Sequence, residues 1–274
     1  MSILTRILSV PVLLAALLAS PASADDRDRA LLLGTTTSVE NSGLLGPLLD
    51  AFHDDTGIEV RAIVRGSGAI LQLGRSGDFD VVLVHHPDAE NAFVADGHGL
   101  ARHPVMTSRF MIVGPAGDPA GVRAATHAPD ALSRIAGGPF PFISRGDRSG
   151  TNATERNLWT VAELSPWTDR APWYRETGSG MGATLNMASA LSAYTFTESG
   201  SWNSFSNRGD LEILFSDGPG LANLYSVIPI NPERHDHIAA GAATRLVDWL
   251  TGPAGQFFIA GFEIDGTPPF TPAR

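Results

Sequence analysis

The most constraining feature of this chain is a repeated alternation of short apolar segments with stretches of helical periodicity. Each apolar segment predicts a buried strand, and apolar residues three or four positions apart predict the helix that follows it. This alternation is typical of βαβ units around a mostly parallel sheet. The predicted strands cover residues 30–33, 58–64, 80–84 and 140–144, with two longer ones at 106–115 and 221–230, and a helix is predicted over 238–250.

The two long strands predict how the chain is divided. The strand at 106–115 leaves a first group of strands and helices, and the strand at 221–230 returns to that group after a second one. We therefore predict an α/β fold of two lobes joined by a two-strand hinge. Residues 25–108 and 231–274 are assigned to lobe 1, and residues 109–230 to lobe 2. Because ligands of open α/β sheets bind at the carboxyl ends of the strands, the predicted ligand cleft lies between the lobes.

The first 24 residues have the layout of a secretory signal peptide. Arg6 precedes an apolar run over 7–18, and the small residues Ala22-Ser23-Ala24 end the segment. The run is shorter than the roughly 20 residues of a membrane-spanning helix, so we predict cleavage after Ala24 rather than an uncleaved anchor. No Cys follows that would carry a lipid, and we therefore expect a periplasmic protein.

Residue types that are missing exclude several chemistries. The chain has no Cys, which excludes disulfides, thiolate nucleophiles and Cys-type zinc sites. Its 19 basic residues are all Arg, so no lysine Schiff base and no P-loop lysine is available. With 29 acidic residues the formal net charge is -10, which argues against a nucleic-acid-binding protein.

Four loops that precede predicted helices are built largely from Gly, Ser and Thr. A helix N-terminus offers unpaired N–H groups and a partial positive charge, and Gly lets the backbone approach a ligand closely. Any one of these loops could be only a helix cap, but several at equivalent positions in two lobes predict an anion site. The loops are residues 34–38, 65–68, 144–151 and 178–182.

The loop over 144–151 is the most specific of the four. It places the guanidinium of Arg145 beside a hydroxyl-rich turn, and Arg is the preferred bidentate partner of oxyanions. Arg145 could instead be a surface residue that pairs only with Asp147. Our interpretation combines both roles: Asp147 orients the guanidinium, and Arg145 contacts the anion.

Several motifs resemble the tungstate-binding proteins of ABC importers, the TupA family. The most specific are Thr35-Thr36-Thr37-Ser38 and Ser144-Arg145-Gly146-Asp147, and the similarity extends over nearly the whole mature chain. The resemblance implies a two-lobed periplasmic-binding-protein fold of type II that delivers tungstate to a membrane permease. The chain departs from the family pattern at His86, where an acidic residue is common, and at Asn152-Ala153, where His-Lys is frequent.

Phosphate is the main alternative ligand, because phosphate-binding proteins of importers are similar in having an Arg, an Asp and a Ser-Gly-Thr in the second lobe. Near neutral pH phosphate keeps a proton and needs a carboxylate acceptor, whereas tungstate and molybdate need donors only. In the phosphate proteins that Asp follows the strand corresponding to 80–84, and here no carboxylate occurs before Asp88. This absence favours tungstate or molybdate, which differ too little in size to be separated.

The remaining alternatives are a metal site and an enzyme. His235 and His237 lie two residues apart with no third ligand at a recognisable spacing, so solvated surface His is favoured. At most one ring of His85-His86 can point into the cleft. An exported hydrolase is the second functional class, but neither Gly-x-Ser-x-Gly nor His-Glu-x-x-His occurs. We expect no metal, no cofactor and no catalysis.

The predicted protein is therefore a monomeric receptor whose two lobes close around one tetrahedral oxyanion and then dock on a permease. Within residues 35–38, the hydroxyls assigned to the ligand could be shifted by one position. The predicted ligand-binding residues are Thr36, Thr37, Ser38 and Ser67 from lobe 1, and Arg145, Ser149 and Thr151 from lobe 2.

Overall fold

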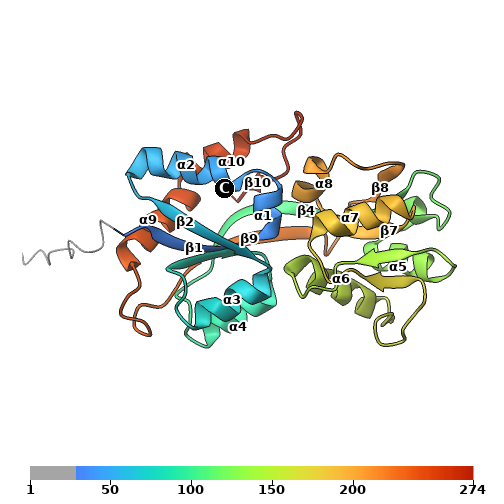
Figure 1. Cartoon of the computed structure of the whole chain (residues 1–274), viewed down its shortest axis with the longest axis horizontal. Helices are drawn as coiled ribbons and strands as arrows, with labels where there is room; N and C mark the ends of the chain where they lie inside the picture. Colours follow the sequence, from blue (N-terminus) through green and yellow to red (C-terminus); the bar gives the residue numbers. More distant parts are fainter. Residues whose placement is uncertain (1–28, 274) are drawn as a thin grey trace, which may run out of the picture.

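The two halves of the chain lie end to end along the long axis of the molecule and are connected by strands (Figure 1). The structure is a computed structural model that describes residues 29–273. The predicted signal peptide over 1–24 lies outside the described residues. The prediction of a two-lobed α/β fold with a two-strand connection is confirmed, whereas the exact lobe boundaries at 108/109 and 230/231 stay a prediction.

The first lobe is built on three parallel strands. Strand β1 pairs with β2 on one side and with β3 on the other, so the carboxyl ends of all three meet at one edge. Every residue of β3 is buried because helices cover both faces of the sheet. The strands are β1 (Leu31–Thr36), β2 (Val60–Arg65) and β3 (Val81–Val84).

The helices of the first lobe form two layers. Helices α2, α9 and α10 pack their apolar side chains on one face of the sheet, and α3 and α4 pack on the other. Amphipathic spacing produces these layers, because one stripe of each helix faces the sheet. The elements are α1 (Thr37–Asn41), α2 (Leu45–Thr56), α3 (Ser67–Arg75), α4 (Pro87–Ala95), α9 (Ala240–Thr251) and α10 (Pro253–Gly261).

The second lobe repeats this arrangement with shorter strands. Strand β5 pairs in parallel with β6 and β7, and an aromatic cluster around Trp159 and Tyr174 fills the core on the α5–α6 side. The strands are β5 (Phe142–Ser144), β6 (Tyr174–Glu176), β7 (Tyr194–Glu198) and β8 (Leu211–Phe215). The helices are η2 (Val122–Ala124), α5 (Ala128–Ala136), α6 (Gly150–Val161), α7 (Met181–Ala190) and α8 (Ser199–Ser204).

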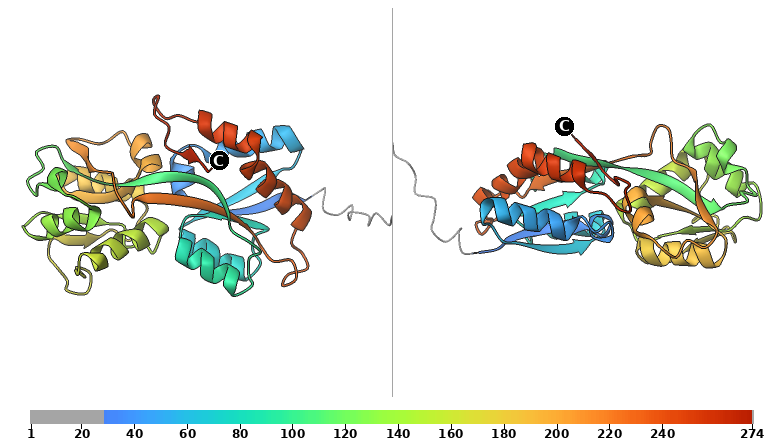
Figure 2. Two further views of the ribbon diagram at one scale, coloured as in Figure 1. Left: turned by 180° about the vertical axis from the view of Figure 1, so that it is seen from behind. Right: turned by 90° about the horizontal axis from the view of Figure 1, so that it is seen from above.

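Two long antiparallel strands, β4 (His103–Pro115) and β9 (Ala222–Pro229), join the lobes. They run side by side from one lobe to the other (Figure 2). The first half of β4 pairs with β9, and its second half pairs with β7 and β8 of the second lobe. The sheet order β2-β1-β3-β9-β4-β7-β5-β6 is therefore continuous through the hinge, and the short β10 (Thr271–Pro272) pairs with β4.

One predicted loop differs from the structure. The loop predicted over 34–38 is the end of β1 followed at once by α1, because Thr35 and Thr36 remain paired with β2. Between α1 and α2 the hydroxyl of Ser42 donates to Val39 O, and α2 begins after Leu44. The helix predicted over 238–250 is α9, which ends at its C-cap Gly252, and Pro253 starts α10, where Pro is tolerated in the first turn.

None of the helices within residues 29–273 is long and apolar enough to span a lipid bilayer.

Candidate functional site

The first-lobe part of the site lies where β1 ends and α1 begins. Thr36 is the last residue of β1, and its Oγ1 lies 2.9 Å from Ser38 Oγ. Both side chains are buried, whereas Thr37 between them is half-buried. Ser67 starts α3 at the end of the neighbouring strand, and its Oγ accepts from the His85 backbone N–H at 3.4 Å. The parallel strands thus bring these hydroxyls to one edge.

The second-lobe part is the turn between β5 and α6. Arg145 is 2% exposed and is the only buried Arg among residues 29–273. Its Nε and Nη2 donate to Asp147 Oδ2 at 3.1 and 2.6 Å, so Asp147 orients the guanidinium as expected. Gly146 makes the turn possible, because its φ is 62° and a Cβ there would lie 2.6 Å from Glu176 Cβ.

Helix α6 begins at the same turn. Ser149 is its N-cap, and its Oγ accepts from the Asn152 backbone N–H at 3.3 Å. The backbone N–H of Ser149 donates to Asp147 Oδ1 at 3.2 Å. Both Ser149 and Thr151 are buried at the helix start. The sequence left open whether this loop caps a helix or contacts an anion. In the structure Ser149 is both the helix cap and a candidate donor to the anion.

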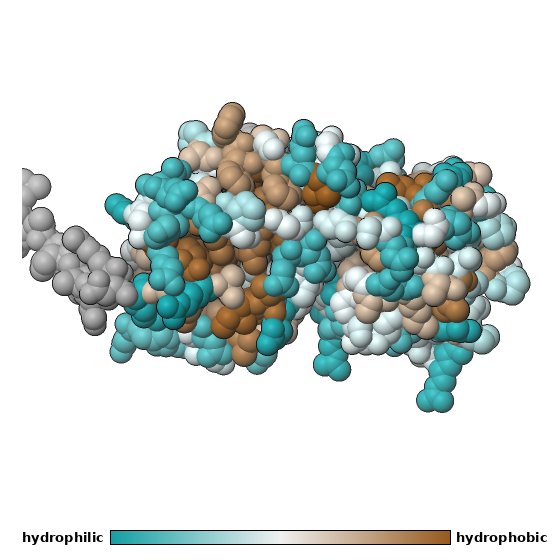
Figure 3. All heavy atoms as spheres, turned by 45° about the horizontal axis from the view of Figure 1, so that its top comes forward, coloured by the Kyte–Doolittle hydropathy of each residue, from teal (hydrophilic) through white to brown (hydrophobic). Residues whose placement is uncertain are grey.

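The two lobes touch at this place. Arg145 Nη2 donates to Thr37 Oγ1 at 3.4 Å across the junction. A Cβ on Gly66 would lie 3.4 Å from Ser149 Cα, and one on Gly150 would lie 2.7 Å from His85 O. The structure thus brings the predicted residues of both lobes to one polar cluster. On the face shown in Figure 3, the surface between the lobes is white and teal with one brown patch.

His85 belongs to this cluster although it was considered only as a metal ligand. It is buried, with Nε2 3.2 Å from Ser38 Oγ and Nδ1 2.8 Å from Asn223 Oδ1. Its ring stacks on Tyr225 with centroids 4.7 Å apart. Burial lowers the pKa of His85 to about 4, so the ring is neutral near pH 7.

Two hinge residues that sequence reasoning missed fix the direction of these hydrogen bonds. Asn223 Nδ2 donates to Ser108 Oγ at 2.9 Å and to Tyr225 OH at 3.2 Å, so its Oδ1 accepts from His85 Nδ1. The neutral ring then accepts from Ser38 at Nε2, and Tyr225 OH donates to Ser38 Oγ at 2.9 Å. The available signal was the pair Asn223 and Tyr225, two residues apart in a largely apolar strand, because such residues share one face.

The site contains carboxylates that do not follow β3. Glu198, at the end of β7, is fully buried and accepts from Ser201 Oγ and, at 3.4 Å, from Thr151 Oγ1. Together with Asp147 it brings two carboxylates to the cluster. The missing carboxylate after residue 84 therefore does not make the site free of carboxylates, and both of those present already have donors.

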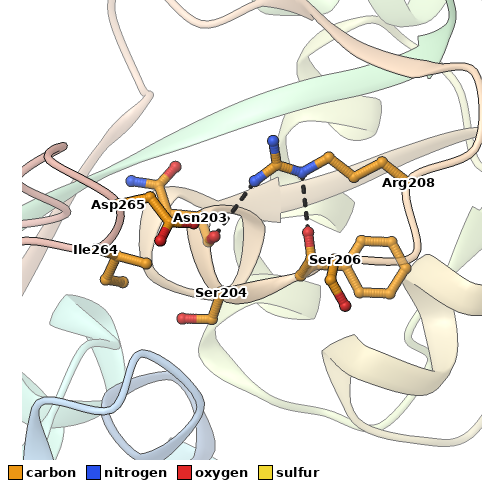
Figure 4. A pocket seen from close by; sticks show the side chains of 7 residues that line it. Asn203, Ser204, Ser206, Arg208, Ile264 and Asp265 are labelled. Atoms are coloured by element: carbon orange, nitrogen blue, oxygen red, sulfur yellow. Dashed lines mark hydrogen bonds between the residues drawn. The ribbon is translucent and has the colours of Figure 1, made fainter.

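A separate surface pocket lies between α8 and the turn at Ile264-Asp265 (Figure 4). Arg208 lines it, and its guanidinium donates to the backbone oxygens of Asn203 at 3.2 Å and Phe205 at 2.9 Å. Those bonds cap the C-terminal end of α8. None of the seven predicted ligand-binding residues lines this pocket.

The His pair of the 231–239 loop is not part of a recognisable metal centre. The rings of His235 and His237 are 5.9 Å apart, and His237 Nε2 lies 2.8 Å from Gly77 O. Within the described part of the chain, no group of three or more His, Cys, Asp or Glu side chains is arranged to hold a metal ion. The expectation that no metal or other cofactor is needed stays a prediction.

The chain is similar to a protein family and to individual proteins that are already known. A family model described as a PBP superfamily domain matches residues 20–254. The tungstate-binding protein TupA of Peptoclostridium acidaminophilum is 41% identical over 249 residues, covering 89% of this chain and 85% of that protein.

Solved structures agree with that result. The tungstate-binding protein TupA from Desulfovibrio alaskensis G20 is 41% identical with a TM-score of 0.77, covering 89% of this chain and 98% of its own. The structure of the tungstate ABC transporter from Geobacter sulfurreducens is 42% identical with a TM-score of 0.77, covering 85% and 99%. These relatives are named for binding and transport rather than for catalysis, which agrees with the expectation that this protein is not an enzyme.

Proposed function

Because this chain belongs to the PBP superfamily and, within it, to the family of the tungstate-binding protein TupA, we propose that it is the substrate-binding protein of an ABC importer and that its ligand is tungstate. The observation that carries the proposal is the buried Arg145, held by Asp147 and facing Thr37 of the other lobe. A buried guanidinium at a junction of hydroxyl groups is suited to an oxyanion.

The donors that we assign to the anion come from both lobes. The contacts of Arg145 with Asp147 and Thr37 use Nε and Nη2, so Nη1 is available to the ligand. Ser149 Oγ accepts from Asn152 N–H, which leaves its hydroxyl hydrogen for the anion. The full proposed set is Thr36, Thr37, Ser38 and Ser67 from lobe 1, and Arg145, Ser149 and Thr151 from lobe 2. The hydroxyl hydrogens of Ser38 and Thr151 go to His85 and Glu198 in this structure, so these two hydroxyls would have to rotate to donate to the anion.

A fully ionised oxyanion fits this set better than phosphate does. The carboxylates of Asp147 and Glu198 already accept hydrogen bonds from Arg145 and from Ser201 and Thr151, so the proton of hydrogen phosphate would have to compete with these donors. An unpaired buried donor or acceptor costs about 1–3 kcal/mol, which gives one to two orders of magnitude of discrimination. Molybdate has the same charge and shape as tungstate and is the expected second ligand.

Closure of the lobes links binding to transport. Only a form with the lobes in contact lets both sets of donors reach one ligand, so the anion stabilises that form. The exported monomer would then present the closed pair of lobes to a membrane permease. Export depends on the predicted signal peptide over 1–24, and the periplasm is the proposed location.

Calorimetric titration with four oxyanions tests the proposal. The purified exported protein should bind tungstate and molybdate tightly, and phosphate and sulfate at least tenfold more weakly. Tight binding of phosphate with no response to tungstate would overturn the assignment.

A further inference from the structure

A buried carboxylate lies directly behind the turn that carries Arg145, and the proposed binding function does not use it. Glu155, on α6, is 1% exposed. Its carboxylate accepts from Ser144 Oγ at 2.7 Å, from Tyr174 OH at 2.9 Å and from Trp159 Nε1 at 3.1 Å. A buried charge is tolerated only when hydrogen bonds satisfy it, and these three donors do so.

One of the three donors connects Glu155 to the anion-binding turn. Ser144 is the last residue of β5 and immediately precedes Arg145. Because its hydrogen goes to Glu155, its oxygen accepts from Asn152 Nδ2 at 3.2 Å. Asn152 in turn accepts from the Arg148 backbone N–H at Oδ1, at 3.2 Å, and donates its own backbone N–H to Ser149 Oγ.

We propose that Glu155 is a positioning residue of the anion site, which fixes the turn at Arg148-Ser149 through Ser144 and Asn152 without touching the anion. The inference rests on the proposed function, because it concerns the same turn. Burial raises the pKa of Glu155 to about 7, so the fold keeps this acid in the core at a cost. A residue needed only to fill the core would be apolar, whereas a carboxylate supplies acceptors to the loop side and the core side together.

The two sides of Glu155 provide a matched pair of variants. Ser144→Ala removes the donor on the loop side, and Tyr174→Phe removes a donor on the core side. Each variant deletes one hydrogen bond to the same carboxylate. We expect Ser144→Ala to weaken tungstate binding at least tenfold, and Tyr174→Phe to leave the dissociation constant within twofold of the wild type. Both are expected to lower the melting temperature.

Substitution of Glu155 itself supplies a second test with rescue by a conservative variant. Glu155→Leu removes every acceptor and should weaken tungstate binding as strongly as Ser144→Ala. Glu155→Gln keeps one acceptor oxygen for the Ser144 hydroxyl and should recover part of the lost affinity. If Glu155→Leu does not fold, the comparison of Ser144→Ala with Tyr174→Phe decides alone.

Titration of the wild type with oxyanions comes first, because it tests the proposed binding function separately from the positioning role of Glu155. A wild type that binds no oxyanion overturns the proposed function, and the positioning role with it. A wild type that binds tungstate while Ser144→Ala binds equally well overturns the positioning role only. Equal weakening by Ser144→Ala and Tyr174→Phe also overturns it, because Glu155 would then act through general stability.

Discussion

Arg145 Nη2 lies 3.4 Å from Thr37 Oγ1, and this hydrogen bond connects the two lobes at the place where both sets of predicted donors meet. The residues are 108 positions apart in sequence. Arg145 is the first residue of the turn between β5 and α6, and Thr37 is the first residue of α1. Each reaches the junction because it follows the carboxyl end of a strand.

Replacement of Arg145 should abolish tight binding while sparing the fold. Arg145→Ala removes the buried guanidinium but leaves Asp147, at 19% side-chain exposure, accessible to water. We expect tungstate affinity to fall at least a hundredfold, with the melting temperature of the unliganded protein nearly unchanged. Arg109→Ala, which breaks the exposed pair with Asp217, is the control and should bind normally. Unfolding of Arg145→Ala with retained affinity in the folded fraction would show that Arg145 is structural.

Gly150 should be essential for contact between the lobes. A Cβ at this position would lie 2.7 Å from the backbone oxygen of His85 and 2.9 Å from its Cε1, so the lobes would have to separate. Gly150→Ala is expected to weaken tungstate binding at least tenfold. Gly182→Ala is the matched control, since it also lies in the first turn of a helix and its Cβ would meet nothing within 4 Å.

Without ligand, Gly182→Ala should leave the melting temperature nearly unchanged because its Cβ would meet nothing within 4 Å, whereas Gly150→Ala should lower it because its Cβ would lie 2.7 Å from His85 O. Calorimetry and thermal unfolding of the two variants check this. Normal affinity in Gly150→Ala would mean that the close approach of Gly150 to His85 is not needed for binding.

Glu155 and His85 should act in opposite directions on the pH dependence of stability. Burial raises the pKa of Glu155 from 4.5 to about 7, so its contribution to the free energy of unfolding is full below pH 4.5 and is lost as the pH rises through 7. Burial lowers the pKa of His85 from 6.5 to about 4, so its contribution is full above pH 6.5 and is lost as the pH falls through 4.

If the titration of Glu155 is removed, the pH dependence of stability that is due to His85 should therefore become visible. In Glu155→Gln, the free energy of unfolding should increase with pH more steeply than in the wild type between pH 5 and 6.5. The difference in slope has an upper limit of about 1.4 kcal/mol per pH unit, the value for one proton. Urea unfolding at pH 5.0, 5.5, 6.0 and 6.5 measures it, and identical slopes would contradict the assigned pKa of Glu155.

The predicted signal peptide can be tested independently of binding. Cleavage after Ala24 leaves Asp25 as the first residue of the exported protein. N-terminal sequencing of protein recovered from the periplasm should begin Asp-Asp-Arg-Asp. A retained Met1 on membrane-bound protein would support the uncleaved anchor instead.

Local signals account for the parts of the fold and site that could be predicted. Apolar strands such as 80–84 and the hydroxyl-rich loops that follow strands are visible within a few residues, and the turn at Arg145 and Asp147 is held by neighbours two residues apart. The alternation of strands and helices then sufficed for two lobes and a hinge.

Long-range pairing determines what could not be predicted. His85 meets Asn223 across 138 positions because β3 pairs with β9 in an antiparallel register. Glu198 reaches the cluster because β7 lies beside β5 and β4. Neither adjacency follows from the local pattern, and for this reason the buried His and the second carboxylate were missed.

The most direct test is a crystal structure of the tungstate complex with data collected at the tungsten absorption edge. We expect a single strong anomalous peak between the lobes, within hydrogen-bond distance of the Arg145 guanidinium and of the hydroxyls at the start of α1. A peak elsewhere, for example in the pocket beside Arg208, with none at Arg145 would contradict it.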